Sequence, residues 1–229
     1  MKIEIWSDLI CPWCGLGQHR LEQALAGFAH REQVEVVHRS FQLDPGASST
    51  PQTARELLTT KYGMKEPQLA ATFARIEGMA ASEGLAPYIV GNNVVGNTSL
   101  AHQLLAFASE RGLEDAAWKH LYRAYFGERR SIFGIDALVE LGSELGLDVT
   151  ELRAALTEGR YQPRVDAEGR EAQELGSTGV PFVVIDRRYA VAGAQPVEAF
   201  REAIERAWRE HPTPIVIASG EVCGPDGCA

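Results

Sequence analysis

The alternation of hydrophobic and polar residues near the start of the chain predicts a strand, a helix and a second strand. Residues 2–7 read Lys-Ile-Glu-Ile-Trp-Ser, with the period of two that is typical of a strand. Leu21, Leu25 and Phe28 follow at helical spacing, and residues 34–43 are rich in β-branched side chains. Two strands joined through a helix in this way run parallel with a right-handed crossover.

The middle of the chain has helical periodicity and no convincing strand. The candidate helices are bounded by glycine or other turn residues and cover about 52–62, 67–83, 98–111, 114–127, 135–145 and 148–158. A further helix at 161–175 leads back to the strand-forming part of the chain. We therefore expect a large all-helical insertion.

The strand pattern returns after residue 180. Residues 183–186 and 189–191 resemble a hairpin, and Pro196 opens a last helix that ends near residue 210. A parallel pair and an antiparallel pair in one four-stranded sheet define an α/β thioredoxin fold interrupted by the helical insertion. The expected units are a discontinuous thioredoxin-like domain at 1–47 and 176–211, an insertion domain at 48–175 and a C-terminal tail at 212–229.

Composition and charge narrow the class of protein. The chain has 229 residues, 45% hydrophobic and 23% charged, which is typical of a globular protein. A formal charge of −9 argues against nucleic acid or an anionic membrane as a partner. No apolar run approaches the roughly 18 residues of a membrane span, and the first residues do not form a signal peptide. We expect a cytoplasmic protein, in which paired cysteines are more often catalytic or metal-binding than structural.

The most informative motif is Cys11-Pro12-Trp13-Cys14, at the junction of the first strand and the first helix. Unpaired N–H groups and the helix dipole stabilise a thiolate at this position. We expect Cys11 to be the exposed nucleophile, and Cys14, one turn into the helix, to be the shielded thiol that resolves a mixed disulfide. Pro12 suits the first helical turn, and Trp13 offers an apolar surface for substrate.

The alternative for this cysteine pair is half of a zinc site. Cys223 and Cys228 could supply the missing ligands, but a four-residue loop with Pro225 and Gly227 is an unusual zinc knuckle. The strand-to-helix context favours redox chemistry, so we expect no metal. The turn-forming loop can instead bring Cys223 and Cys228 close enough for a disulfide, and we predict an accessory redox pair in the tail, against the alternative of two incidental thiols.

Val180 and Pro181 precede the third predicted strand. A generic bond before proline is cis in only about 5–6% of cases. In a thioredoxin-type sheet, however, this loop lies beside the helix that carries the first cysteine, so we predict a cis bond. The Val180 backbone would then face an incoming extended peptide.

Several other residues have both a functional and a structural interpretation. Asp8 could accept a proton from Cys14, but aspartate is a favoured helix-entry residue and we expect it to cap the turn. We expect His102 to be a hydrogen-bonded structural histidine rather than a proton carrier. Four aromatic residues at helical spacing are expected in the insertion core rather than in a ligand pocket: Trp118, Tyr122, Tyr125 and Phe126.

Taken together, the motifs resemble the DsbA family, specifically its FrnE-like branch of thiol-disulfide oxidoreductases. The shared pattern covers about residues 1–211 and consists of Cys11-Pro12-Trp13-Cys14 after an Ile-Trp-Ser-Asp strand, Phe41-Gln42-Leu43-Asp44-Pro45, Asn97-Thr98 before Ala101-His102, and Gly179-Val180-Pro181. The resemblance implies disulfide oxidoreductase or isomerase activity, with Cys11 and Cys14 beside a cis Pro181. It implies protein or peptide thiols and disulfides as substrates, glutathione as a further candidate, and no cofactor.

A different enzyme class shares the same layout. Glutathione-dependent kappa-class transferases and 2-hydroxychromene-2-carboxylate isomerases typically have a serine at the position of the first cysteine. The presence of both Cys11 and Cys14 argues against them. The direction of catalysis and the oligomeric state stay open, because reduction potentials of such sites span about −120 to −270 mV.

Overall fold

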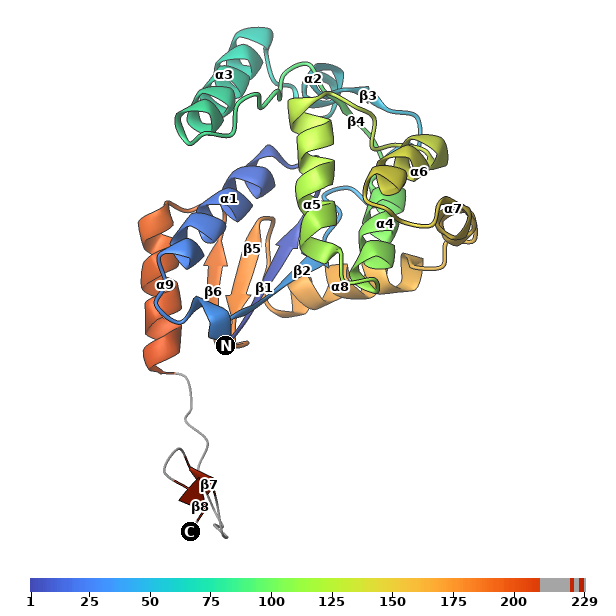
Figure 1. The fold of residues 1–229 in the computed structure, drawn as a ribbon. Helices are drawn as coiled ribbons and strands as arrows, with labels where there is room; N and C mark the ends of the chain where they lie inside the picture. Colours follow the sequence, from blue (N-terminus) through green and yellow to red (C-terminus); the bar gives the residue numbers. More distant parts are fainter. Residues whose placement is uncertain (211–222, 225–226, 229) are drawn as a thin grey trace.

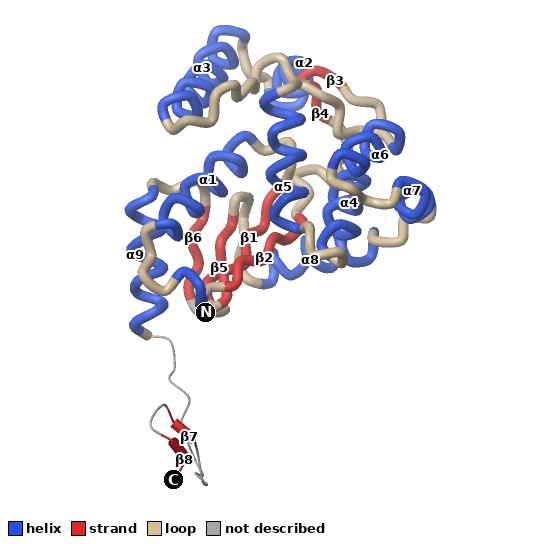
Figure 2. The backbone as a smooth tube through the Cα atoms, in the orientation of Figure 1, coloured by secondary structure: helices blue, strands red, loops and turns tan. Residues whose placement is uncertain are grey.

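The computed structural model describes residues 1–210 and the backbone of residues 223–224 and 227–228. Its centre is a sheet of four strands in the order β2 (Glu35–Ser40), β1 (Lys2–Ser7), β5 (Phe182–Ile185) and β6 (Tyr189–Ala192). β1 runs parallel to β2 and antiparallel to β5, and β5 is antiparallel to β6. The predicted thioredoxin-type sheet is confirmed (Figure 2).

Each face of the sheet is covered by helices, because successive side chains of a strand point to opposite faces. Helices α1 (Pro12–Ala26) and α9 (Val197–Arg209) cover one face, as Figure 1 shows. Their core contains Ile3, Ile5, Leu21, Leu25, Val183, Ile185, Phe200 and Ile204. On the other face Trp6, Phe182 and Val184 pack with Ala172 of α8 (Gln162–Glu174).

The insertion between β2 and α8 is almost entirely helical. The insertion contains α2 (Ala54–Tyr62), α3 (Glu66–Ser82), α4 (Ser99–Ser109), α5 (Glu114–Tyr122), the π-helical turn η2 (Arg123–Gly127), α6 (Ile135–Glu144) and α7 (Val149–Thr157). Outside the insertion, a short 3₁₀ turn, η1 (Arg31–Gln33), precedes β2. Two differences from the expectation are small. β3 (Gln52–Thr53) pairs with β4 (Val94–Val95), and the helix predicted at 114–127 ends as a π-turn. Strands of two residues are too short to show a period.

Helix α8 joins the two units. It packs on α4 of the insertion and on β2 of the sheet. Its Glu168 backbone oxygen accepts a hydrogen bond of 2.8 Å from the Trp6 indole, and a Glu168 carboxylate oxygen accepts one of 2.7 Å from the Ser40 N–H. The helix therefore connects the insertion to the sheet as the sequence predicts, and it also forms the sheet's second helical layer.

A buried ionic cluster lies on β1. Glu4 is only 1% exposed, and its carboxylate accepts hydrogen bonds from Arg39 (2.9 Å) and Arg187 (2.7 Å). Burial alone would raise the pKa of Glu4, but the hydrogen bonds and charges of Arg187 and Arg39 outweigh it and lower the pKa. Glu4 is therefore fixed as a carboxylate.

The structure tests two further expectations from the sequence, the one about a membrane span and, for four residues only, the one about the C-terminal tail. No helix in the described part of the chain is long and apolar enough to cross a membrane. In the tail, β7 (Cys223–Gly224) and β8 (Gly227–Cys228) pair antiparallel, which places the Cys223 backbone opposite that of Cys228. The rest of the predicted tail lies outside the described residues.

Candidate active site

The site is built on the start of α1. Cys11 is the N-cap residue in an extended conformation, and Pro12 occupies the first turn, where its missing N–H removes no helix bond. The Cys11 N–H donates to the Asp8 backbone oxygen (3.2 Å) and the Cys14 N–H to the Cys11 oxygen (3.0 Å). No side chain caps this helix end. The Cys11 thiol therefore lies at the positive end of the helix dipole without a competing anionic cap.

Both thiols are free and both are buried. Cys11 is 4% exposed and Cys14 is 0% exposed. The expectation that Cys11 is exposed is therefore wrong. The loop before β5 contacts it from one side, with the Cys11 Sγ 3.6 Å from the Val180 oxygen, and the Tyr88 hydroxyl donates to the neighbouring Pro12 oxygen at 2.6 Å. The sequence could not show these two segments closing over the helix end.

The Val180–Pro181 bond is cis, as predicted. Pro181 lies so close to α1 that a Cβ atom on Gly17 would be 2.7 Å from the Pro181 Cγ. On the adjacent side of the helix a Cβ atom on Gly15 would be 2.4 Å from the Tyr88 hydroxyl oxygen. Our sequence analysis missed Gly15, Gly17 and Tyr88. The available signal was two glycines inside a helix, where each costs about 1 kcal/mol relative to alanine.

Asp8 does not cap the helix, so that expectation is wrong. Its carboxylate accepts a hydrogen bond from the Leu43 N–H (2.8 Å), and its other oxygen lies 3.2 Å from the Nε2 of His102. Asp8 and His102 are both fully buried, and the imidazole packs edge-on against Trp118. His102 is hydrogen-bonded in the core as expected, but its partner is the carboxylate nearest to the cysteine motif in sequence.

The two cysteines differ in their electrostatic surroundings. Burial raises the pKa of Cys14 well above its ordinary value, and the hydrogen bond and charge of Cys11 raise it further. The Asp8 backbone lowers the pKa of Cys14, whereas the Asp8 carboxylate charge raises it. Burial also raises the pKa of Tyr88 and Tyr122, with smaller contributions from Cys11 and Cys14. Cys14 is thus held as a neutral thiol that needs a proton acceptor before it can attack.

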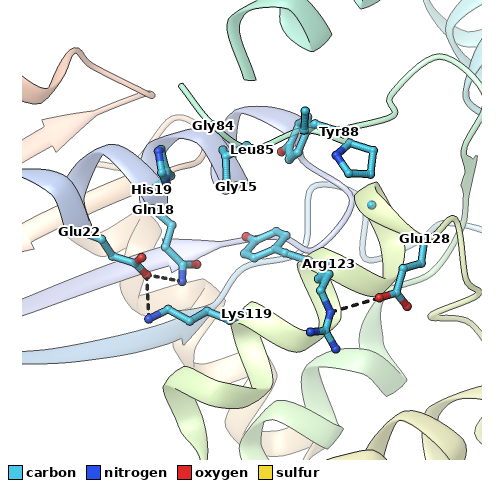
Figure 3. Close-up of a pocket in the computed structure, with 14 residues that line it drawn as sticks. Gly15, Gln18, His19, Glu22, Gly84, Leu85, Tyr88, Lys119, Arg123 and Glu128 are labelled. Atoms are coloured by element: carbon cyan, nitrogen blue, oxygen red, sulfur yellow. Dashed lines mark hydrogen bonds and ion pairs between the residues drawn. The ribbon is translucent and has the colours of Figure 1, made fainter. Parts of the chain in front are cut away.

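A cavity of about 470 Å³ lies beside α1 (Figure 3). Gly15, Gln18 and Glu22 line it from α1, Lys119 from α5, and Tyr88 from the segment before β4. Tyr122, expected only in the core, also lines this cavity. Trp118, Tyr125 and Phe126 are buried in the insertion core as predicted.

The remaining predicted site residues are placed as follows. Trp13 is partly buried at the edge of the insertion core, and the Arg75 guanidinium lies 5.2 Å from the centre of its ring. Among the described residues no three His, Cys, Asp or Glu side chains gather into a metal-binding group. The side chains of Cys223 and Cys228 lie outside the description, so their accessory redox role stays a prediction.

Comparison with known proteins places this site in a family. Residues 2–205 match the DSBA-like thioredoxin domain. A probable DsbA oxidoreductase from Streptomyces coelicolor is 48% identical, with a TM-score of 0.90 over 100% of this chain and 98% of that one. The cytosolic disulfide reductase DsbM from Pseudomonas aeruginosa, solved with GSH, is 20% identical, with a TM-score of 0.61 over 91% and 100% of the two chains.

A 2-hydroxychromene-2-carboxylate isomerase shares the fold at 16% identity, with a TM-score of 0.68 over 92% of this chain and 98% of that one. This likeness concerns the fold, which supports several chemistries. The match to the family model covers nearly the whole described chain and includes Cys11, Cys14 and Pro181. The chain belongs to the DSBA-like thioredoxin domain family of thiol-disulfide oxidoreductases.

Proposed function

We propose that this protein exchanges disulfides with protein or peptide substrates in the cytoplasm, with Cys11 as the nucleophile and Cys14 as the resolving thiol. The observation that carries the proposal is the position of the Cys11 Sγ, at the N-terminus of α1 and 3.6 Å from the Val180 oxygen. Cys14 lies one turn further into the helix with no exposed surface, whereas Cys11 keeps 4% of its surface exposed, which supports attack on the substrate by Cys11. Pro12, Trp13, Val180 and Pro181 surround that approach and form the substrate-binding residues of the proposal.

In the reductive direction the Cys11 thiolate attacks one sulfur of the substrate disulfide. The substrate S–S bond breaks, one substrate thiolate leaves, and Cys11 forms a mixed disulfide with the other half. Cys14 then attacks the Cys11 sulfur, releases the second substrate thiolate and forms the Cys11–Cys14 disulfide. Two electrons pass to the substrate, and an external thiol such as glutathione restores the dithiol. The reverse sequence oxidises a substrate dithiol, and the reduction potential sets the direction.

The resolving step needs a group that takes the Cys14 proton. Asp8 is the candidate, because its carboxylate acts electrostatically on Cys14 and is hydrogen-bonded to His102. Because a carboxylate only accepts hydrogen bonds, the imidazole donates its Nε2–H to Asp8 and holds the carboxylate in place. The interpretation of Asp8 as a proton acceptor, second choice from the sequence, thus becomes the better one once capping is excluded.

The isomerase and kappa-class alternative has less support from this site. Such enzymes rely on a hydroxyl at the nucleophile position, and this chain has a thiol there with a second thiol one turn away.

Two substitutions test the proposal. Cys11→Ser should abolish reduction of insulin disulfides by dithiothreitol above the uncatalysed rate. Cys14→Ala should accumulate a mixed disulfide that mass spectrometry detects. The double variant Cys223→Ser/Cys228→Ser is the control for the tail and reports whether the accessory pair contributes. Full activity in Cys11→Ser would refute the assignment of the nucleophile.

A further inference from the structure

An arginine of α3 lies over the tryptophan of the active-site motif. Arg75 is exposed, and its guanidinium lies 5.2 Å from the centre of the Trp13 ring. Helix α3, which carries it, packs against α1 (Figure 1). The negative face of an indole attracts a guanidinium, so the ring holds the cation in place. Because Trp13 follows Cys11 by two residues, Arg75 puts a positive charge at the edge of the active site.

The chain itself does not neutralise this charge. Within the described residues the Arg75 guanidinium forms neither a hydrogen bond nor an ion pair. Its neighbours three and four positions away on the helix are uncharged: Ala71, Thr72, Gly78 and Met79. Glu77, two positions on, accepts hydrogen bonds from the N–H groups of Val90 (2.7 Å) and Gly91 (3.1 Å). The nearest carboxylate in the sequence is therefore already used elsewhere.

The arginines at the two ends of α3 behave differently. Arg55 pairs with Glu66 at the start of the helix, and Arg20 donates to Glu83, directly after its end, at 2.9 Å. The chain has 31 acidic and 22 basic residues, so carboxylates are more numerous than cations. Arg75 is thus held by a ring of the active-site motif while its charge stays available to an external anion.

We propose that Arg75 is a specificity-determining residue, which selects polypeptide substrates with Asp or Glu within about three residues of the reactive cysteine. The inference rests on the proposed function, because it requires the substrate cysteine to reach Cys11 past Trp13. An extended chain advances about 3.3 Å per residue, so side chains two or three positions from that cysteine pass the guanidinium.

The geometry of the guanidinium allows both contacts at once. One flat face lies on the Trp13 ring, and the N–H groups point outward in the plane of the guanidinium, where a carboxylate can accept two of them. Because the ring already restrains the side chain, less conformational entropy is lost on binding. Exposed ion pairs change an equilibrium constant by up to about fivefold, so we expect a preference of about threefold for an acidic substrate.

The first test compares two peptides of the same shape. Each substrate is a disulfide-linked dimer of a decapeptide with a central cysteine, and the residues two positions before and after the cysteine are Glu in one peptide and Gln in the other. Dithiothreitol is the reductant. The wild type should have a kcat/KM about threefold higher for the Glu peptide, and Arg75→Gln should lower this ratio at least twofold. Arg75→Glu should lower it further, because the two carboxylates repel each other.

The matched control is Arg201→Gln. Arg201 is exposed on α9 and has no ion pair within the described residues, so this variant removes the same charge from a position without a neighbouring ring. Its ratio should equal that of the wild type. Sodium chloride at about 0.5 M should lower the wild-type ratio towards one, because salt screens exposed charges. If Arg75 only packs on Trp13, Arg75→Gln slows both peptides equally, and an unchanged ratio overturns the proposal.

The second test needs no activity. Peptides with serine in place of cysteine are titrated into the reduced wild-type chain, and NMR follows the Arg75 Nε–H and the Trp13 indole N–H. Larger shifts with the Glu peptide than with the Gln peptide support the proposal. Equal shifts, or none at millimolar peptide, overturn it. If neither disulfide is reduced or exchanged, the proposed function fails and these shifts alone decide the role of Arg75. Exchange of both peptides at equal rates leaves the proposed function standing and removes the specificity.

Discussion

Two buried carboxylates, Glu4 within β1 and Asp8 directly after the strand, have different surroundings. Glu4 is 1% exposed and accepts hydrogen bonds from two arginines, which lower its pKa. Asp8 is 0% exposed and has one backbone N–H and the imidazole of His102 as its partners. A carboxylate held by arginines stays ionised, because guanidinium groups do not release protons. A carboxylate beside a histidine and a thiol can take part in proton transfer.

The largest effect should follow from Asp8→Asn. If Asp8 accepts the Cys14 proton, the resolving step should slow by about a hundredfold at neutral pH, a typical contribution of a general base. Removing the Asp8 charge should at the same time lower the pKa of Cys14, since that charge raises it. Stopped-flow decay of the mixed disulfide measures the rate, and thiol absorbance at 240 nm measures the titration.

The rate and the titration together distinguish a role of Asp8 as proton acceptor from a role of its charge alone. With charge as the only role of Asp8, the lower pKa of Cys14 would make resolution faster. A rate that is unchanged or increased at neutral pH would therefore rule out Asp8 as the proton acceptor. The slow rate should recover as the pH rises, because hydroxide then removes the Cys14 proton.

Glu4→Gln should lower the stability of the protein and leave its exchange rate unchanged, in contrast to Asp8→Asn, which slows the resolving step. Arg39 keeps Glu168 and Arg187 keeps Glu171 as partners, so the variant loses the charge-assisted hydrogen bonds to Glu4 without stranding a buried charge, which costs about 1–3 kcal/mol of stability. Urea unfolding should show this loss, while the exchange rate of the folded protein stays within twofold of the wild type. A slower exchange without a loss of stability would show that Glu4 also belongs to the active site.

Gly17→Ala, in α1 next to Pro181, should have a smaller effect. The new methyl group would collide with the Pro181 ring at 2.7 Å, and overpacking of this kind costs about 1–3 kcal/mol. The better helix propensity of alanine offsets about 1 kcal/mol of this cost. Gly78→Ala, which meets nothing within 4 Å, should instead gain up to about 1 kcal/mol. Equal stability changes in the two variants, by urea unfolding, would show that the Gly17–Pro181 contact is unimportant.

The sequence predicts the features that depend on local patterns. Alternation gives β1 and β2, helical spacing gives the helices of the insertion, and the Cys-x-x-Cys spacing at a strand-to-helix junction gives Cys11 and Cys14. A proline directly before a strand, combined with the expected thioredoxin-type sheet, predicts the cis bond at Pro181. Each of these signals lies within about twenty consecutive residues.

Features that depend on long-range contacts were missed or wrongly predicted from the sequence. Tyr88 reaches Pro12 from 76 positions away, and His102 reaches Asp8 from 94 positions away. Asp8 has the residue type and position of a helix cap, and nothing local shows that Leu43 and His102 take up its oxygens. The burial of Cys11 depends on Val180, which follows the whole insertion. Such contacts become visible only when the topology is known.

The smallest effect is a pH dependence of stability, to which Glu4 in β1 and Cys14 in α1 contribute at opposite ends of the pH range. The pKa of Glu4 is lowered by folding, so its contribution is present above its unfolded value near 4.3 and is lost as the pH falls through the folded value. The pKa of Cys14 is raised by folding, so its contribution is present below its unfolded value near 8.5 and is lost as the pH rises above it.

Urea unfolding of the reduced protein between pH 3 and pH 10 should therefore show losses at both extremes. Each group contributes at most about 1.4 kcal/mol per pH unit. Cys14→Ala should flatten the alkaline side between about pH 8.5 and 10 and leave the acid side unchanged, and Glu4→Gln should flatten only the acid side. Above about pH 10 the raised pKa values of Tyr88 and Tyr122 add a further loss that Cys14→Ala keeps. An alkaline side that is equally steep in Cys14→Ala would show that Cys14 ionises in the folded state as easily as in the unfolded chain, and the need for a proton acceptor at Asp8 would then disappear.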